Sequence, residues 1–379
     1  MWFSFRLTGF RTLKYRCPLH LIESLLLFEM AFAVKIPIFV FFLLSLQQSA
    51  LSASQFPCFF IFGDSLIDNG NNNKLITKAK VDYLPYGIDF PQGPTGRFTN
   101  GQNTADILAK FLGFDTYIPP FAMAKGEDIL KGVNYGSGSA GIRSETGQQL
   151  GDRISLNRQL LNHELTVSRI TNLLGNNTSA KKHLGKCLYY FVIGSNDYLN
   201  NYYIPEHYPT SSQYTPDEYA TVLVQQYSQQ LKTLYNYGAR KISVSGLGLL
   251  GCIPAVLARG GNGTACVDTV NDAVDLFNEK LKILVKDLNK NLTDAQFIII
   301  NAMRMAPAEL FSLGVKFLRE PCCKVSNTTG QCIPGETPCL IRELHAFYDN
   351  FHPTDIMNKV AATAAYLDIQ KLILRQWIE

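Results

Sequence analysis

The 379-residue sequence has little surplus charge of either sign. It carries 35 Lys and Arg against 31 Asp and Glu, a formal net charge of +4, and no basic run follows residue 52. Proteins that bind nucleic acid usually carry a basic patch that neutralises phosphates, so we expect no nucleic-acid partner. Hydrophobic residues make up 46% of the chain, which indicates a large globular core rather than a disordered chain.

Long hydrophobic runs are also scarce, and the main one lies near the start of the chain. Ile36–Leu46 follows Lys35 and precedes small residues that reach Ala53, which is the order of a secretory signal. The run is too short to span a bilayer comfortably. A signal anchor over Leu21–Leu46 is the alternative, but three charged side chains interrupt it, and we favour the cleaved signal.

Met30 divides this N-terminal stretch, because a signal normally starts near its own methionine. The sequence after the signal shows no internal repeat and no low-complexity linker. We therefore expect an exported protein without a stable membrane anchor. The chain is predicted to have three parts: an upstream extension of the gene model at residues 1–29, a secretory signal peptide at 30–53, and a single domain at 54–379.

Cysteine usage agrees with export. Of nine cysteines, Cys17 lies in the N-terminal stretch, which leaves an even number. An even number in an exported chain favours disulfides, and Cys252–Cys266 would close a short loop. The spacing of the cysteines after residue 321 fits no common zinc pattern, and no histidine joins them before His345. The remaining eight are Cys58, Cys187, Cys252, Cys266, Cys322, Cys323, Cys332 and Cys339.

Acceptor motifs for N-glycosylation all lie after the signal segment, as export requires. The candidate asparagines are Asn176, Asn177, Asn262, Asn291 and Asn327.

Strand-like apolar runs alternate with amphipathic helical stretches along the rest of the chain, which implies a parallel sheet with helices on both faces. The expected fold class is α/β, a three-layer αβα sandwich with a five-stranded, mainly parallel sheet. Strands are predicted at Cys58–Phe62, Gly132–Tyr135, Leu188–Ile193, Lys241–Val244 and Phe297–Ile300. Helices are predicted at Asn103–Leu112, about Ile154–Leu174, Thr215 to Gly238, Val267–Leu288, and from Pro353 towards Trp377.

Polar residues gather where several of these segments end. Ser65 follows the first strand, residues 136–138 follow the second, Asn196 follows the third, and Asp349 and His352 precede the last helix. Ligands of such sheets bind beyond the carboxyl ends of the strands, so these loops should meet at one edge. Acyl transfer needs a nucleophile, a base, an orienting carboxylate and oxyanion donors. The set provides all four.

An ordered series of motifs extends this pattern over nearly the whole chain after the signal, and it resembles the plant-type GDSL esterases/lipases of the SGNH hydrolase superfamily. The motifs are FGDSLIDNGNNN at 62–73, PYGIDFP at 85–91, TGRFTNG at 95–101, NYGSGSAGI at 134–142, IGSNDY at 193–198, GLGLLGCIP at 246–254, the Cys322-Cys323 pair and DNFHPT at 349–354.

The resemblance implies an SGNH, flavodoxin-like hydrolase fold and a role for each candidate residue. Ser65 would be the nucleophile, His352 the base and Asp349 its orienter. The oxyanion hole would consist of the backbone N–H groups of Ser65 and Gly138 and the side-chain amide of Asn196. The family often has two adjacent glycines where this chain reads Gly138-Ser139. No cofactor and no metal are implied.

Competing patterns are weaker. Gly136-x-Gly138-x-x-Gly141 matches a dinucleotide fingerprint, but residues 143–147 lead to a glycine rather than into a packed helix. The Gly-x-Ser-x-Gly elbow of α/β-hydrolases is absent. His345 is a rival base that lacks an acidic residue at the same offset, and an Asp-x-x-His pair before a helix can equally be a capping arrangement. Asp197 is interpreted as a structural brace of its loop.

We therefore predict a secreted serine esterase or lipase that hydrolyses carboxylic esters through an acyl-enzyme. Its substrate is expected to be a small-molecule, lipid or acylated-polysaccharide ester of the apoplast or cell wall, and the protein is expected to be a monomer. Two alternatives stay open: an acyltransferase that assembles extracellular polyester, and a secreted binding protein with an idle site. The intact set of serine, histidine, aspartate and asparagine argues against the second.

Overall fold

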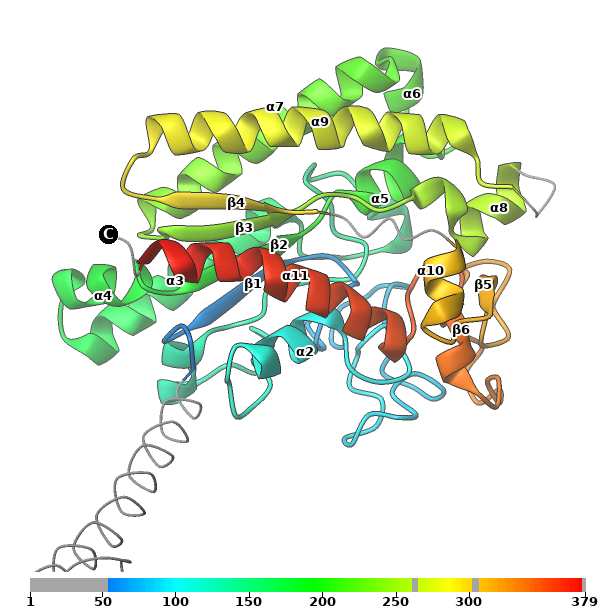
Figure 1. Ribbon diagram of the computed structural model, residues 1–379, viewed down its shortest axis with the longest axis horizontal. Helices are drawn as coiled ribbons and strands as arrows, with labels where there is room; N and C mark the ends of the chain where they lie inside the picture. The colour runs from blue at the N-terminus through cyan, green and yellow to red at the C-terminus, as the bar shows by residue number, and fades with distance from the viewer. Residues whose placement is uncertain (1–53, 261–264, 302–306, 377–379) are drawn as a thin grey trace, which may run out of the picture. The chain divides into compact units, whose positions relative to one another are not determined.

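A four-stranded parallel sheet forms the centre of the structure (Figure 1). Its strands follow one another in the order of the chain, and every neighbouring pair is parallel. This is the α/β class that the sequence predicts. The strands are β1 (Phe59–Gly63), β2 (Leu188–Val192), β3 (Lys241–Ser245) and β4 (Gln296–Ile300).

Within the residues that the structure describes, the sheet has four regular strands where the sequence predicts five. Gly132–Tyr135 lies beside the free edge of β1, but it forms only an isolated bridge from Asn134 to Ile61. The Ile61 N–H donates to Val133 O (3.0 Å) and the Tyr135 N–H to Ile61 O (2.7 Å). Asn134 also bridges Pro120 on its other side, and both pairings are isolated bridges outside the regular strands. With this segment counted as an edge, the spatial order becomes that of flavodoxin-like sheets.

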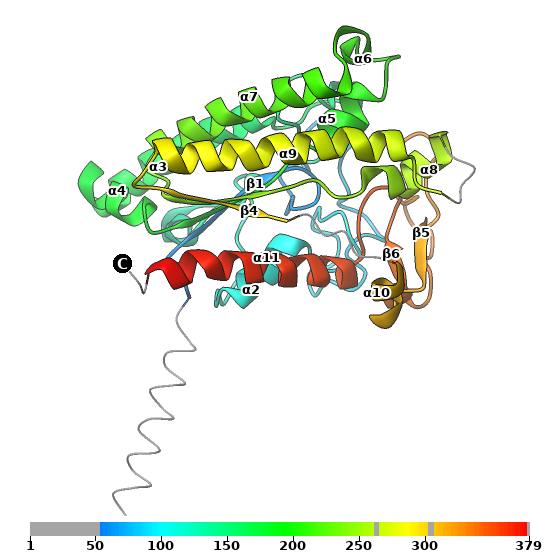
Figure 2. The ribbon, with the colours of Figure 1, turned by 45° about the horizontal axis from the view of Figure 1, so that its top comes forward.

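Helices cover both faces of the sheet and make three layers (Figures 1 and 2). Helices α3 (Leu156–Leu174), α7 (Pro216–Asn236) and α9 (Asp268–Asn291) pack on one face, and α2 (Thr104–Phe111) and α11 (Asp355–Gln376) pack on the other. Side chains of a strand alternate between faces, so Phe60 and Phe62 join the first helix layer while Phe59 and Ile61 join the second. All five residues of β1 are buried, which explains its continuous apolar run.

Local signals explain where the main helices begin and end. α7 starts with a capping box, in which Thr215 accepts from the Glu218 N–H while the Glu218 carboxylate accepts from the Thr215 N–H. Pro216 occupies its first position, and Gly238, at φ +108°, follows its end. The larger helices are α2 (Thr104–Phe111), α3 (Leu156–Leu174), α4 (Asn177–Leu184), α7 (Pro216–Asn236), α9 (Asp268–Asn291) and α11 (Asp355–Gln376).

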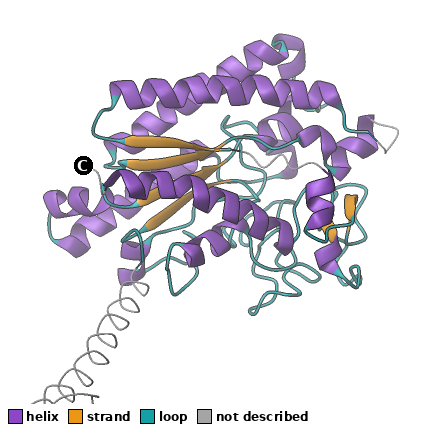
Figure 3. Cartoon of the chain, in the orientation of Figure 1, coloured by secondary structure: helices purple, strands orange, loops and turns teal. Residues whose placement is uncertain are grey.

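Loops and shorter elements gather beyond one end of the strands, towards α8 (Pro254–Gly260) and a small second sheet (Figures 1 and 3). That sheet pairs β5 (Phe317–Pro321) with β6 (His345–Phe347). The short helices are α5 (Ser195–Asp197), α6 (Thr210–Gln213), α8 (Pro254–Gly260) and α10 (Pro307–Ser312). Short 3-10 helices are η1 (Gly126–Lys131), η2 (Gln148–Leu150), η4 (Leu250–Cys252) and η5 (Arg342–Leu344), and η3 (Tyr198–Tyr202) is a π-helical turn.

All eight cysteines that follow the predicted signal form disulfides, as the sequence predicts, and the expected Cys252–Cys266 loop closure is among them. Two further disulfides cross-link the segment that precedes β6. The four bridges are Cys58–Cys187, Cys252–Cys266, Cys322–Cys339 and Cys323–Cys332.

The computed structural model describes residues 54–260, 265–301 and 307–376. The predicted extension at 1–29, the predicted signal at 30–53 and the candidate Asn262 lie outside these ranges. Ser54–Glu379 groups as one unit. Within the described ranges, no helix is both long enough and apolar enough to cross a membrane.

Candidate active site

The loops after β1 and β2 and the loop before α11 bring three predicted site residues to one pocket of about 530 Å³. Ser65, Asn196 and His352 all line it. β1 ends at Gly63, where a side chain would lie 2.0 Å from Val192 O, so only glycine allows the two strand ends to approach this closely. The pocket therefore sits beyond the carboxyl ends of the strands, where parallel sheets bind ligands.

Ser65, His352 and Asp349 form a continuous hydrogen-bonded chain. Ser65 Oγ lies 2.8 Å from His352 Nε2, and His352 Nδ1 lies 2.8 and 2.9 Å from the two Asp349 oxygens. An ionised carboxylate can only accept hydrogen bonds, so Nδ1 carries the proton and Nε2 is free to accept from the serine hydroxyl. Ser65 is 9% exposed, His352 6% and Asp349 0%, so only the serine and histidine reach solvent. The arrangement can remove a proton from Ser65.

Asp349 is held in place by more than the histidine. Its Oδ1 accepts from the backbone N–H groups of Phe351 and His352, both at 2.8 Å. The buried Tyr86 hydroxyl donates to Asp349 Oδ2 at 2.5 Å, and it accepts from the Cys332 N–H at 3.0 Å. Burial, and next the charge of Asp349, raise the pKa of Tyr86 well above its ordinary value, so the phenol stays a donor.

Tyr86 is a site residue that sequence reasoning did not single out. It lies in the PYGIDFP motif, far from Asp349 along the chain, and a lone tyrosine in a loop carries no catalytic signal. The aromatic ring of Phe98, in the TGRFTNG motif, packs 4.8 Å from the His352 ring. These two motifs therefore supply the walls that fix the imidazole and its carboxylate.

Asn196 presents its amide to the pocket in one orientation. Its Oδ1 accepts from Asn200 Nδ2 at 2.6 Å, and its Nδ2 donates one hydrogen to Ala140 O at 2.9 Å. The second hydrogen of Nδ2 has no acceptor among the described residues. The side chain is 7% exposed and uncharged, which suits a donor to a developing negative charge.

The Ser65 backbone N–H is a second donor without an acceptor among the described residues. The turn that contains it is closed by its neighbours, because Leu66 N–H donates to Asp64 Oδ1 at 3.0 Å and Ile67 N–H to Asp64 O at 3.3 Å. Burial raises the pKa of Asp64 to about 7. Its Oδ2 accepts no hydrogen bond within the described ranges.

Gly138 is placed differently from what its expected role requires. Its N–H donates to Asp68 Oδ2 at 3.0 Å, so this donor is already engaged, and Gly138 itself does not line the pocket. A side chain there would lie 2.7 Å from Asn72 Nδ2 and 2.8 Å from Phe98 Cζ, which accounts for the glycine by packing.

The next residue, Ser139, does line the pocket, and its N–H has no acceptor in the described part of the chain. Ser139 has φ +62°, a left-handed conformation that no other non-glycine residue adopts within the described ranges. Such strain concentrates at functional sites, where the surrounding structure enforces it.

Several polar residues near the pocket brace loops instead of facing substrate. Asp197 Oδ2 accepts from the Ile142 N–H (2.8 Å), and Oδ1 accepts from the Arg143 N–H (3.0 Å) and the Thr146 hydroxyl (2.7 Å). The asparagines of the 69–73 run donate to backbone oxygens of neighbouring loops. His345 lies on β6, stacks on Phe317 and does not line the pocket.

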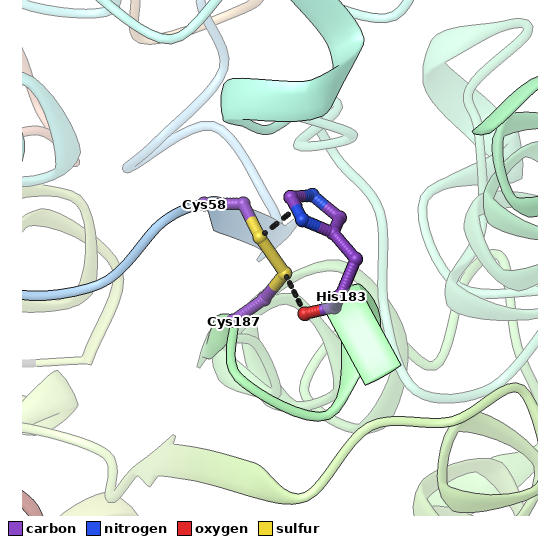
Figure 4. A group of neighbouring side chains, drawn as sticks. All are labelled: Cys58, His183 and Cys187. Atoms are coloured by element: carbon purple, nitrogen blue, oxygen red, sulfur yellow. Dashed lines mark hydrogen bonds between the residues drawn. A yellow bond between two sulfur atoms is a disulfide. The ribbon is translucent and has the colours of Figure 1, made fainter. Parts of the chain in front are cut away.

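One cluster has the residue types of a metal site but not its chemistry. Cys58, His183 and Cys187 meet at the opposite end of β1 and β2 (Figure 4). The two sulfurs are joined in a disulfide and so offer no thiolate. His183 Nε2 lies 3.0 Å from Leu130 O, a contact that requires the nitrogen to donate a proton.

Comparisons with known proteins agree with this geometry. The family model GDSL-like Lipase/Acylhydrolase matches residues 59–365. The chain is 50% identical over 325 residues to the Arabidopsis thaliana protein GDSL esterase/lipase At1g29670, covering 84% of this chain and 88% of that protein. It is 48% identical over 316 residues to GDSL esterase/lipase At4g18970 of the same organism, covering 82% and 88%.

The chain therefore belongs to the GDSL lipase/acylhydrolase family, as its motifs indicate. It is a carboxylic ester hydrolase, and its substrates are esters.

Proposed function

We propose that the protein hydrolyses its esters through an acyl-enzyme formed on Ser65. The observation that carries this proposal is the hydrogen-bonded chain from Ser65 through His352 to Asp349, whose serine and histidine line the pocket. A serine hydroxyl is a weak nucleophile until a base takes its proton. His352 Nε2, at 2.8 Å, is within reach to do so.

In the first half of the reaction, Ser65 Oγ attacks the ester carbonyl carbon while His352 Nε2 takes the hydroxyl proton. The resulting imidazolium is stabilised by Asp349 through Nδ1–H. His352 then gives the proton to the leaving alkoxide, the C–O bond breaks, and the alcohol departs. In the second half, His352 activates water, which attacks the acyl carbon and releases the acid and Ser65.

Negative charge on the carbonyl oxygen needs donors that are preorganised in the ground state. We assign this role to the Ser65 N–H and the free hydrogen of Asn196 Nδ2. For the third donor we assign the Ser139 N–H in place of the expected Gly138 N–H, because Asp68 already holds the latter. The strained φ of Ser139 turns this part of the loop to the pocket.

We further propose that the protein is exported and glycosylated, and that its substrate is a lipid, small-molecule or acylated-polysaccharide ester outside the cell. The four disulfides support export, because such bonds persist in oxidising compartments. Four of the candidate glycosylation asparagines lie in the described ranges, and all four are exposed. The pocket wall mixes apolar side chains such as Leu199 and Ile253 with hydroxyl and amide groups, which fits an ester with an apolar and a polar half.

Replacement of the nucleophile tests the proposal. Ser65→Ala should lower the turnover of short p-nitrophenyl esters by about a millionfold, because the covalent route is lost. The fold should persist, since Ser65 is a small residue at a strand end. Circular dichroism and melting temperature provide the control for folding. A folded Ser65→Ala protein that keeps most of its activity would contradict the proposed mechanism.

A further inference from the structure

One wall of the pocket is a short hairpin whose residues 326–331 all face the cavity. The hairpin is closed by a bridge between Val325 and Cys332, and the Ser326 N–H donates to Gln331 O at 2.8 Å. Serine, threonine and glutamine side chains make this wall polar, and none of its residues carries a charge. The wall is therefore a polar surface that substrate in the pocket can contact.

This hairpin is fixed relative to the catalytic residues. Cys332 is joined to Cys323 by a disulfide. Gly330 O accepts from the Asn350 N–H at 3.1 Å, and Asn350 is two residues before His352. A group attached to the hairpin would therefore keep a defined position over the pocket.

The tip of the hairpin carries one of the acceptor motifs for N-glycosylation. Asn327 is followed by Thr328 and Thr329, the required Asn-x-Thr order. Asn327 and Thr328 are exposed in a turn, and Asn327 itself lines the pocket. The Asn327 side chain makes no hydrogen bond to any described residue, so its amide nitrogen is accessible for modification.

We propose that Asn327 carries an N-glycan that stands at the mouth of the catalytic pocket and limits the size of ester that reaches Ser65. The inference rests on the proposed export and serine chemistry. In the modification, Asn327 Nδ2 bonds to the anomeric carbon of an oligosaccharide, the amide loses one proton, and the lipid diphosphate carrier of the secretory pathway leaves. The attached glycan is bulky and hydrated, so it excludes large substrates and leaves a path for small ones.

The position of another motif provides a matched comparison. Asn291 ends α9, immediately before β4 begins at Gln296. It therefore lies at the amino ends of the strands, at the edge opposite the pocket, and it is exposed. A glycan at Asn291 can affect solubility and folding, but it cannot cover Ser65.

The test uses the full chain secreted from a eukaryotic host that glycosylates it. Asn327→Gln and Thr329→Ala each remove the motif at the pocket, whereas Thr329→Ser keeps it, and Asn291→Gln removes the distant one. Peptide mapping with and without enzymatic deglycosylation reports glycan occupancy at each asparagine. Accessibility of Ser65 is measured as the labelling rate with a small alkyl fluorophosphonate and with a bulky biotin-linked fluorophosphonate.

The expected result is an Asn327 glycan in the wild-type protein and in Thr329→Ser. Asn327→Gln and Thr329→Ala remove the motif, and each should raise the ratio of the bulky-probe to the small-probe labelling rate about fivefold or more. Because both probes react with Ser65, this ratio measures how well a bulky reagent reaches the nucleophile relative to a small one. Asn291→Gln should leave the ratio unchanged.

Two results would overturn this inference and leave the proposed serine chemistry standing. One is an unmodified Asn327 in the secreted protein. The other is a glycan at Asn327 whose removal changes the ratio of labelling rates no more than Asn291→Gln does. Failure of both probes to label the wild-type protein would contradict the proposed serine chemistry, and the inference would fall with it.

Discussion

The Tyr86 hydroxyl donates a 2.5 Å hydrogen bond to Asp349 Oδ2, the same oxygen that lies 2.8 Å from His352 Nδ1. Tyr86 is fully buried, and its oxygen also accepts from the Cys332 N–H, next to the disulfide that closes the pocket hairpin. The orienting carboxylate is thus tied to two distant parts of the chain. This bond partly neutralises Asp349 and so sets how strongly the carboxylate stabilises the imidazolium.

Tyr86→Phe should lower kcat/KM about tenfold, because the Asp349 carboxylate loses the donor that fixes its position beside His352. Without its donor, the Asp349 carboxylate binds the imidazolium more tightly, so the acidic limb of the kcat/KM profile should move to higher pH. If Tyr86 had only a structural role, its replacement would lower activity without shifting the acidic limb of the kcat/KM profile. Tyr83→Phe is the matched control, because Tyr83 packs on Tyr86 but donates to Cys332 O. A Tyr86→Phe profile that coincides with the Tyr83→Phe profile would remove Tyr86 from the site.

Asn196 and Asp197 are adjacent but should respond in different ways. Asn196→Ala should lower kcat by about a hundred- to a thousandfold with little change in KM, because the lost bond strengthens only as the oxyanion forms. Asp197→Asn should mainly lower the melting temperature, since its carboxylate accepts three hydrogen bonds that hold the 142–146 loop. Kinetics and thermal melts of both variants decide the assignment. A normal kcat for Asn196→Ala would exclude it from the oxyanion hole.

Much of the active site could be predicted from the sequence alone. The motifs place Ser65, Asn196, Asp349 and His352 at one sheet edge because parallel strands end there, and the structure brings all four together. Helix boundaries such as Thr215 were predictable from capping residues, which act locally.

What depended on tertiary contacts was not predictable. The stretch at 132–135 has the apolar pattern of a strand, but its pairings with Ile61 and Pro120 are isolated bridges at Asn134. The Tyr86–Asp349 bond joins residues 263 positions apart. The engagement of the Gly138 N–H by Asp68 depends on a contact across 70 positions, which no local pattern reveals.

Ser139→Gly separates the backbone of this residue from its side chain. Glycine keeps the N–H and adopts φ +62° without strain, so kcat should stay within about twofold while stability rises by up to about 1 kcal/mol. Ser139→Ala keeps the strain and also keeps the N–H, and should retain activity without the gain in stability. A tenfold fall of kcat in Ser139→Gly would show that the hydroxyl, and not the N–H alone, acts in the site.

Stability should fall as pH rises through the range in which buried carboxyl groups ionise. Burial raises the pKa of Asp64 from 3.8 to about 7, so the folded protein holds a proton that the unfolded chain releases. The folded state therefore binds more protons between these two values, and its stability decreases with increasing pH there. Burial also raises the pKa of Asp68 and Asp197 to about 6, with the same sign.

Asp64→Asn removes the largest of these contributions. Its melting temperature should fall less steeply than that of the wild-type protein between about pH 4 and 7. Asp128→Asn, which changes an exposed carboxylate, should leave the slope unchanged. Parallel slopes for Asp64→Asn and the wild-type protein would contradict the account of Asp64.

The most direct test of the mechanism is to locate the covalent adduct of a small fluorophosphonate on the secreted protein by peptide mapping. A serine reacts with this reagent when an adjacent base activates it. The account predicts one adduct per chain, on Ser65, with labelling slowed by orders of magnitude in a folded His352→Ala variant. An adduct on another residue, or undiminished labelling of Ser65 without His352, would contradict it.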